Sequence, residues 1–209
     1  MGLEVELKLQ LVSSEDYVTL CARLPSFLGE QVQRNVYFDV PGGRLRQARV
    51  LLRLRVEGPR AWLTVKYAPT IEDDGLFAVP EDEEPLSTEV AARVLAGEVP
   101  LDDVDSIVLE RLRAAVGNTT GLRPWGRLEN VRRRYRLSPE WVVEVDRTEF
   151  PGGLVEWEVE LEGADPRGGA TLLSPYLEGV RWLPQRKPKS QRLVEYLSSI
   201  EGPSAGPMA

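Results

Sequence analysis

The sequence predicts an α+β protein built on a closed antiparallel β-barrel of eight strands, with helices packed outside. Three observations predict this fold. Eight segments have the apolar and polar alternation of strands, several are joined by short turns, and charged residues occupy one face of many of them. Eight strands are enough to close a small barrel around side chains and a ligand.

The predicted strands are joined by turns that favour hairpins. The segments 57–60 and 150–153 are rich in Gly and Pro, which favours antiparallel hairpins over crossover connections. Pro80 lies inside the fifth strand, where we expect it to shift the register by one residue. The expected strands cover residues 3–12, 32–39, 49–57, 60–68, 76–84, 126–137, 141–148 and 153–162.

Five helices are expected between and after the strands. The first three begin at Ser, Thr or Asp, which cap helix N-termini, and two of them end before a glycine. Pro175 disturbs the fourth, and Pro188 suits the first turn of the last. The expected helices run from Ser13 or Ser14 to about Leu24, from Ser87 or Thr88 to before Gly97, from Asp102 or Asp103 to before Gly117, from Ala170 to Leu177, and from Pro188 to about Ile200.

Charge is sorted along these strands. In an extended strand, Glu4, Glu6 and Lys8 share one face, while Val5 and Leu7 share the other. Basic residues gather at 53–66 and 132–136 and acidic residues at 144–160, a separation from which a solvent-facing surface gains nothing. We therefore expect the charged faces to line the barrel interior. Acidic and basic rows in one cavity suit a metal-bound polyphosphate, because Mg²⁺ and Mn²⁺ prefer oxygen ligands while Arg and Lys bind phosphate.

Composition limits the alternatives. The 209 residues, 42% of them hydrophobic, suit one domain over residues 1–200 with a disordered tail at 201–209. A net charge of −7 argues against a nucleic-acid binder. The single cysteine, Cys21, excludes a disulfide framework, and the lack of His removes the usual zinc ligand and neutral-pH base. Without a signal peptide or membrane span in the sequence, we expect a cytoplasmic monomer.

Charged motifs follow one another in a fixed order along the chain. They are Glu4-x-Glu6-x-Lys8, Arg53-x-Arg55, Lys66, the acidic cluster 81–84, Glu129-Asn-Val-Arg132, Asp146 and Glu156-x-Glu158. This ordered set resembles the CYTH, or triphosphate tunnel metalloenzyme, superfamily from residue 2 to about residue 200. It is most similar to the plant-type tripolyphosphatase branch, on the segments 4–9, 50–55, 66–70 and 143–146.

The resemblance implies a site for two divalent metal ions, Mg²⁺ or Mn²⁺. It gives Glu4 and Glu6 the catalytic role of positioning these ions. Glu160 continues the face of the last acidic motif, and we interpret it as a rim or structural residue. The implied metal ligands are Glu4, Glu6, Glu156 and Glu158, followed by Asp146, Glu83 and Glu81.

The resemblance also implies a set of phosphate-binding cations, which would contact the nonbridging oxygens. A C-terminal helix is expected to close one end of the barrel and to contribute one further cation, for which Arg192 and Lys189 are both candidates. The implied substrate-binding residues are Lys8, Arg53, Arg55, Lys66, Arg132, Lys189 and Arg192.

The implied reaction is metal-dependent hydrolysis of tripolyphosphate, a small-molecule substrate, to pyrophosphate and phosphate. Thiamine triphosphatases and class IV adenylate cyclases are alternatives on the same fold. The former have a tryptophan before the basic strand pair, where this chain has Val50-Leu51-Leu52, and no base pocket for the latter is evident. A noncatalytic polyphosphate sensor, and a barrel with charges facing solvent, are alternatives of other classes.

Overall fold

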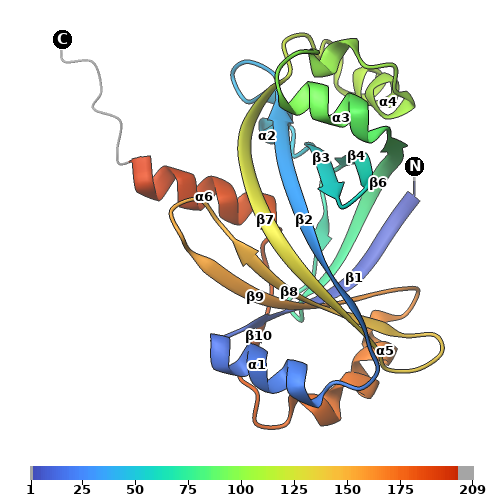
Figure 1. Ribbon diagram of the computed structural model, residues 1–209, viewed down its shortest axis with the longest axis vertical. Helices are drawn as coiled ribbons and strands as arrows, with labels where there is room; N and C mark the ends of the chain where they lie inside the picture. The colour runs from blue at the N-terminus through green and yellow to red at the C-terminus, as the bar shows by residue number, and fades with distance from the viewer. Residues whose placement is uncertain (1, 202–209) are drawn as a thin grey trace.

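Eight antiparallel strands close into a barrel in the computed structural model, which describes residues 2–201 (Figure 1). Their order is β1-β9-β8-β7-β2-β3-β4-β6, and pairing of β1 with β6 completes the circle. The predicted fold class is therefore confirmed. Of the predicted tail at 201–209, Glu201 is instead the last residue of the C-terminal helix, and residues 202–209 lie outside the described residues. The barrel strands are β1 (Gly2–Leu11), β2 (Phe27–Asp39), β3 (Leu51–Glu57), β4 (Arg60–Lys66), β6 (Leu76–Leu86), β7 (Arg123–Arg136), β8 (Val142–Glu149) and β9 (Val155–Glu162).

Two short strands that the sequence did not predict extend the sheet. β10 (Trp182–Pro184) pairs with residues 9–11 of β1, beyond the point where β6 leaves that strand. β5 (Thr70–Ile71) pairs with residues 77–78 of β6, on a stretch that β4 does not reach. Strands of two or three residues are too short to produce a recognisable alternation.

Pro80 does not shift the register of β6, contrary to expectation. β6 pairs with β1 through residues 76–81 and with β4 through residues 81–86 in unbroken registers. The carbonyl of Pro80 accepts a hydrogen bond from the Tyr67 amide, which lies just past the end of β4. The N–H that proline lacks would point to this same side, so the β1 ladder loses nothing.

Six helices lie outside the barrel in the described part of the chain. Ser13 and Ser87 cap α1 and α3 through their side chains, as predicted. No helix within residues 2–201 is long and apolar enough to cross a membrane. The helices are α1 (Ser14–Arg23), α2 (Arg44–Gln47), α3 (Thr88–Leu95), α4 (Ile107–Val116), α5 (Pro166–Leu173) and α6 (Lys189–Glu201), with 3₁₀ turns at Leu101–Asp103 and Ser174–Leu177.

Two helix starts differ from prediction. The third helix was expected at Asp102 or Asp103, but α4 begins after Ser106, whose side chain accepts from the Leu109 amide. Asp102 instead accepts hydrogen bonds from the amides of Gly121 and Leu122. The fourth helix begins at residue 166 rather than 170, capped by Asp165, and continues as the 3₁₀ turn in which Pro175 lies.

The apolar core lies on the outside of the barrel wall. Leu52, Leu54 and Leu63 face outward from β3 and β4 and pack against α3 and α4. At the opposite end of the barrel, a second cluster joins β1, β8 and β9 to α1 and α5 (Figure 1). Because the strands alternate, their other faces point into the barrel, and these are the faces that carry charge.

Candidate active site in the barrel

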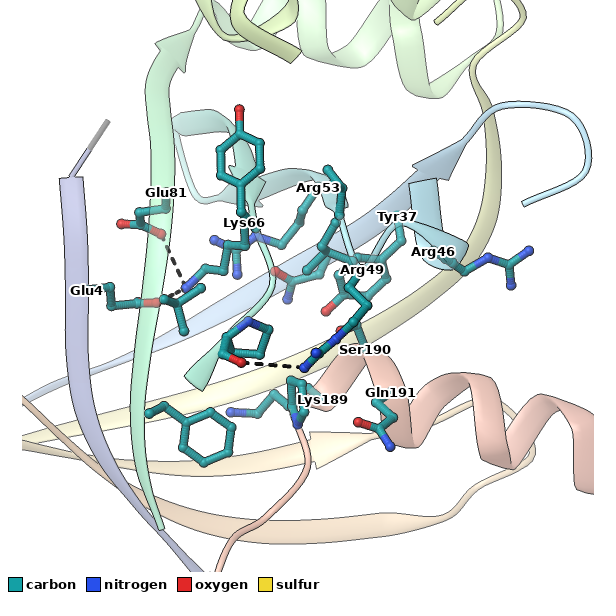
Figure 2. Close-up of a pocket in the computed structure, with 18 of the residues that line it drawn as sticks. Glu4, Tyr37, Arg46, Arg49, Arg53, Lys66, Glu81, Lys189, Ser190 and Gln191 are labelled. Atoms are coloured by element: carbon teal, nitrogen blue, oxygen red, sulfur yellow. Dashed lines mark hydrogen bonds and ion pairs between the residues drawn. The ribbon is translucent and has the colours of Figure 1, made fainter. Parts of the chain in front are cut away.

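The barrel encloses a cavity of about 810 Å³ lined by charges of both signs (Figure 2). A polar interior of this size is costly unless the charges compensate one another or bind a ligand. The lining cations are Lys8, Arg46, Arg49, Arg53, Arg55, Lys66, Arg132 and Lys189, and the lining carboxylates are Glu4, Glu6, Glu81, Glu83, Glu160 and Glu162.

Glu4 and Glu6 project into the cavity from β1, as predicted. Glu4 contacts the Lys66 ammonium, which also lies 3.3 Å from Glu81 Oε2 (Figure 2). Glu6 lies 3.0 Å from Lys8 Nζ. Burial raises the pKa of Glu6 to about 7, because the attraction of Lys8 is opposed by repulsion from Glu160 and Glu4. Burial also acts on Glu4, but Lys66 and Lys8 outweigh it and lower the pKa of that carboxyl. The pKa of Glu6 is therefore raised and that of Glu4 lowered, although the two carboxyls are neighbours on one face of β1.

The backbone of Lys8 is held by two later segments. Its N–H donates to the Gly75 carbonyl at 2.9 Å, and its own carbonyl accepts from the Gln185 N–H at 2.9 Å. Gly75 has φ of +89°, and a Cβ there would lie 2.4 Å from the Lys8 carbonyl oxygen. Only glycine fits this close approach, so residue 75 fixes the strand that carries Glu4, Glu6 and Lys8.

A closed ionic network fills the wall formed by β7, β8 and β9. Asp146, which is fully buried, accepts from Arg132 Nε at 2.8 Å and Nη2 at 2.7 Å, and from Lys189 Nζ at 2.8 Å. Arg132 also contacts Glu144 and Glu160. Arg132 and Lys189 together hold the pKa of Asp146 down, at about 2, against the effect of burial. Every member of this network has an opposite charge within hydrogen-bonding distance.

The N-terminus of α6 resolves the choice between Lys189 and Arg192. Lys189 lines the cavity, with Nζ 2.6 Å from Glu160 and 3.0 Å from Glu158. Arg192, one turn later, contacts Glu156 and Glu158, with Nη2 2.7 Å from Glu158 Oε2, and does not line the cavity. Lys189 is therefore the cation that α6 presents to the interior, and Arg192 fastens the helix to β9.

The glutamates of β9 that line the cavity lie further along the strand than the predicted Glu156 and Glu158. β9 pairs with β1 so that Glu160 lies opposite Lys8 and Glu162 lies opposite Glu6. Glu160 and Glu162 line the cavity, whereas Glu156 and Glu158 do not and are bound to Arg192. Glu160 is only 4% exposed and so is not a rim residue, whereas its ion pairs with Lys8, Arg132 and Lys189 agree with the structural half of that interpretation. All four glutamates share one face of the strand, and only the pairing register separates them.

Arginines on β3 form the opposite wall, with fewer carboxylate partners. Arg53 donates to Thr64 Oγ1 at 3.2 Å and lies 3.7 Å from Glu83 Oε2. Arg55 donates to Asn35 Oδ1 at 2.9 Å, and no carboxylate of residues 2–201 lies within 4 Å of it. Burial, with Arg53 and Arg132 nearby, lowers the pKa of Arg55 to about 10. Arg55 is therefore a cation that lacks a carboxylate partner within residues 2–201.

Neutral side chains between these walls were not predicted. Gln33, Asn35 and Asn130 are buried and line the cavity from β2 and β7. Asn130 donates to Gln33 Oε1 at 3.0 Å and accepts from the Thr148 hydroxyl at 2.8 Å. Their signal in the sequence is their spacing, since Gln33 and Asn35 lie two positions apart and therefore share one face of β2. They supply polar contacts without adding charge.

Aromatic rings border one side of the cavity. Tyr37 and Trp125 stack with centroids 5.5 Å apart, and the Arg46 guanidinium lies 4.5 Å from the Trp125 ring. Arg46 is fixed by a 3.0 Å bond from Nε to Asp39 Oδ2. The ring of Trp125 thus already contacts two side chains, Tyr37 and Arg46.

The chemistry of the acidic residues fits a hard divalent cation, but their arrangement ties them to protein cations. All carboxylates of the cavity offer oxygen, the ligand that Mg²⁺ and Mn²⁺ prefer. Among residues 2–201, no three acidic, His or Cys side chains lie in a group that could hold a metal ion. Glu4, Glu6 and Glu160 contact Lys66 or Lys8 instead, so metal binding requires these carboxylates to exchange partners.

Comparisons with known proteins agree with this geometry. The family model of the CYTH domain matches residues 2–178. HpAC1 from Hippeastrum, a proposed adenylyl cyclase with a dominant triphosphatase activity, is 25% identical and superposes with a TM-score of 0.85 over 92% of this chain and 96% of its own. No match is found among curated protein sequences.

Two further solved structures share the fold. A proposed adenylate cyclase from Bacillus halodurans is 24% identical, with a TM-score of 0.70 over 92% of this chain and 98% of its own. PH1819 from Pyrococcus horikoshii is 16% identical, with a TM-score of 0.58 over 91% of this chain and 99% of its own. At these identities, the likeness concerns the fold alone.

Proposed function

Because the chain belongs to the CYTH domain family, we propose that it is a divalent-metal-dependent triphosphatase that hydrolyses inorganic tripolyphosphate to pyrophosphate and phosphate. The observation that carries this proposal is Arg55, which shares the cavity with Arg53 and Arg132 but has no carboxylate partner among the described residues. Three guanidiniums around one space favour a ligand with several anionic oxygens. The dominant triphosphatase activity of the similar HpAC1 supports the same reaction class.

Phosphate oxygens are bound, in this proposal, by the cations of the cavity. Arg53 and Arg55 hold the triphosphate from β3, and Lys66 and Lys8 turn to it from the sides. Lys189 reaches the same space from α6, and of the two predicted candidates on this helix we assign the phosphate contact to Lys189 rather than Arg192. These groups compensate the substrate charge, and they also offset the charge that builds up on the leaving pyrophosphate.

The carboxylates that face the cavity would hold the metal ions. We assign this role to Glu4 and Glu6 of β1 with Glu160 and Glu162 of β9, because the register brings the two pairs side by side. Bound Mg²⁺ or Mn²⁺ would neutralise phosphate charge and make the attacking water more acidic. Lys66 and Lys8 would then be released from Glu4 and Glu6 to bind phosphate oxygens.

The reaction is a direct displacement by water. The water oxygen bonds to the terminal phosphorus, the bridging P–O bond breaks, and its electron pair leaves with pyrophosphate. The proton released by the water passes to solvent or phosphate. No cysteine or histidine takes part, since the cavity contains neither.

A compact inorganic substrate is favoured over one with an aromatic group. Val50 and Leu51 line the cavity in the stretch before the basic strand pair, where the thiamine triphosphatases that this sequence resembles have a tryptophan. Trp125 does line the cavity, but Tyr37 stacks on it and Arg46 lies over it. A nucleobase or thiazolium ring would have to displace one of them to stack.

The test is phosphate release from tripolyphosphate, ATP and thiamine triphosphate, each with Mg²⁺, Mn²⁺ or EDTA. We expect metal-dependent release that is fastest with tripolyphosphate. Glu160→Gln should lower this rate at least about 100-fold, as removal of a charged group from a catalytic site does. The matched variant Glu156→Gln should retain it within a few-fold. If tripolyphosphate binds but is not cleaved, the protein is a sensor; if Glu156→Gln is the more damaging change, the ligand assignment is wrong.

A further inference from the structure

We propose that Arg49 forms a separate phosphate subsite at the mouth of the cavity, where it binds the outer phosphates of linear polyphosphates longer than tripolyphosphate. The proposal rests on the proposed function, because it extends the same cavity outward. Arg49 belongs to none of the motifs that the sequence analysis singled out. It nevertheless lines the cavity.

Arg49 continues a row of arginines that runs from the interior to the mouth. It precedes β3, on which Leu51, Arg53 and Arg55 line the cavity in alternation. At about 3.3 Å per residue, Arg53 and Arg55 are separated by roughly 7 Å, and Arg49 lies up to roughly 13 Å further out than Arg53. A tripolyphosphate has only two bridging oxygens and is shorter than the whole row. When it occupies the buried arginines, Arg49 is left for a longer chain.

The backbone at Arg49 supports a role for its side chain. Its φ is +57°, a left-handed conformation that costs an L residue on the order of 1 kcal/mol and that Gly or Asn adopts more cheaply. Two hydrogen bonds hold this turn, from the Arg49 N–H to the Arg46 carbonyl at 3.0 Å and from the Val50 N–H to the Leu45 carbonyl at 2.8 Å. The turn therefore places the Arg49 side chain at the cavity, at a position whose backbone conformation Gly or Asn would adopt more easily.

The guanidinium of Arg49 is available to an anion. Its one hydrogen bond is long, 3.4 Å from Nη2 to the Pro69 carbonyl, and no carboxylate of residues 2–201 lies within 4 Å. Figure 2 shows it extending across the cavity above Lys189, with Ser190 and Gln191 of α6 on the facing side. A phosphate offers charge and two oxygens to the guanidinium fork, and so binds it more strongly than a neutral carbonyl does.

The experiment compares chain lengths in binding. Calorimetry in EDTA, which removes the metal and prevents turnover, gives the Kd of tripolyphosphate and of a linear chain of about eight phosphates. Arg49→Asn removes the cation and tolerates the left-handed backbone. The control is Arg44→Asn, because Arg44 is an exposed cation of the same loop that bonds to the Asn118 carbonyl and does not line the cavity.

We expect Arg49→Asn to raise the Kd of the long chain about tenfold, the size of one charge-assisted hydrogen bond, or about 1.4 kcal/mol. The Kd of tripolyphosphate should change less than about twofold, and Arg44→Asn should change neither. Equal weakening at both lengths would overturn the proposal, since Arg49 would then belong to the triphosphate site. An unchanged Kd for the long chain would overturn it as well.

The outcome is separable from that of the proposed function. A wild-type protein that binds long chains through Arg49 but never releases phosphate with metal present retains the subsite and loses the triphosphatase activity. A protein that cleaves tripolyphosphate, but whose affinity for long chains does not depend on Arg49, retains the activity and loses the subsite.

Discussion

Two walls of the same cavity use their charges differently. On the β7–β9 wall, Asp146, Arg132 and Lys189 are all bound to opposite charges within 3 Å. On the β3 side, among the described residues, Arg55 bonds to an amide and Arg49 to a backbone carbonyl, and neither has a carboxylate partner. Buried charges are costly unless they are paired, so the paired network compensates its own charges, while the proposed triphosphate would compensate the unpaired arginines. The comparison separates charges that are paired within the described residues from charges that are left without a carboxylate partner there.

The largest effect should come from breaking the paired wall. Asp146→Asn leaves Arg132 and Lys189 without their fully buried counterion and should lower the free energy of unfolding by about 3–5 kcal/mol. Urea unfolding measures it. Asp74→Asn is the matched control, because Asp74 pairs with Arg167 at the surface and such pairs contribute little. A loss below about 1 kcal/mol at Asp146 would mean that the network is not what stabilises this wall.

Removing an arginine from β3 should have the opposite pair of effects, with little change in stability and a clear loss of affinity for tripolyphosphate. Arg55→Met removes the bond to Asn35 but also the repulsion from Arg53 and Arg132, so stability should stay within about 1 kcal/mol of wild type. The Kd of tripolyphosphate should rise at least about tenfold, which corresponds to about 1.4 kcal/mol.

The control for this second change is Arg60→Met, since Arg60 lies in the exposed β3–β4 turn with Glu57 as its partner. It should leave the Kd unchanged. Calorimetry measures the Kd of tripolyphosphate, and urea unfolding of the same preparations measures stability. If Arg55→Met were to unfold the protein readily and leave the affinity intact, the two walls would not differ as described.

The smallest effect concerns an ion pair remote from the cavity. The pKa of Asp16 lies at about 2, lowered by the Ser13 hydroxyl and by the backbone N–H and guanidinium of Arg181. A carboxyl whose pKa is lower in the folded state than in the unfolded state stabilises above its unfolded value, near 4, and this contribution is lost as the pH falls toward 2.

Asp16→Asn should therefore lower the Tm at pH 7 by a few degrees, and the difference from wild type should vanish near pH 2. Thermal scans between pH 7 and pH 2 measure this. Glu15→Gln, in the same helical turn, should show no such convergence. A Tm difference that grew on acidification would contradict the assigned direction of the pKa change.

The sequence was informative where a local pattern determines the structure. Alternation located all eight barrel strands, because most of them have an apolar face for the outer core and a polar or charged face for the interior. It could not find β5 and β10, which are too short to alternate. The expected cap at Asp102 or Asp103 was wrong, because Asp102 accepts hydrogen bonds from the distant amides of Gly121 and Leu122 and Ser106 caps α4 instead.

The sequence predicted which kinds of residue line the cavity, but not which glutamates of β9 do so. Glu4, Glu6, Lys8, Arg53 and Arg55 all line the cavity, since each lies on a strand whose face the local alternation fixes. The acidic residues of β9 repeat every second position, so their shared face does not say which of them meets β1. The pairing of Glu160 with Lys8 depends on tertiary structure, and it places Glu160 and Glu162 in the cavity rather than the predicted Glu156 and Glu158.

The two short strands have a consequence for how the protein behaves in a concentrated solution. β10 covers the side of β1 that β6 leaves, and β5 covers the side of β6 that β4 does not reach. At these corners the barrel would otherwise offer a row of backbone donors and acceptors to a strand from another molecule. Because the strands that cover the corners are only three and two residues long, the edges they present are too short to template edge-to-edge aggregation.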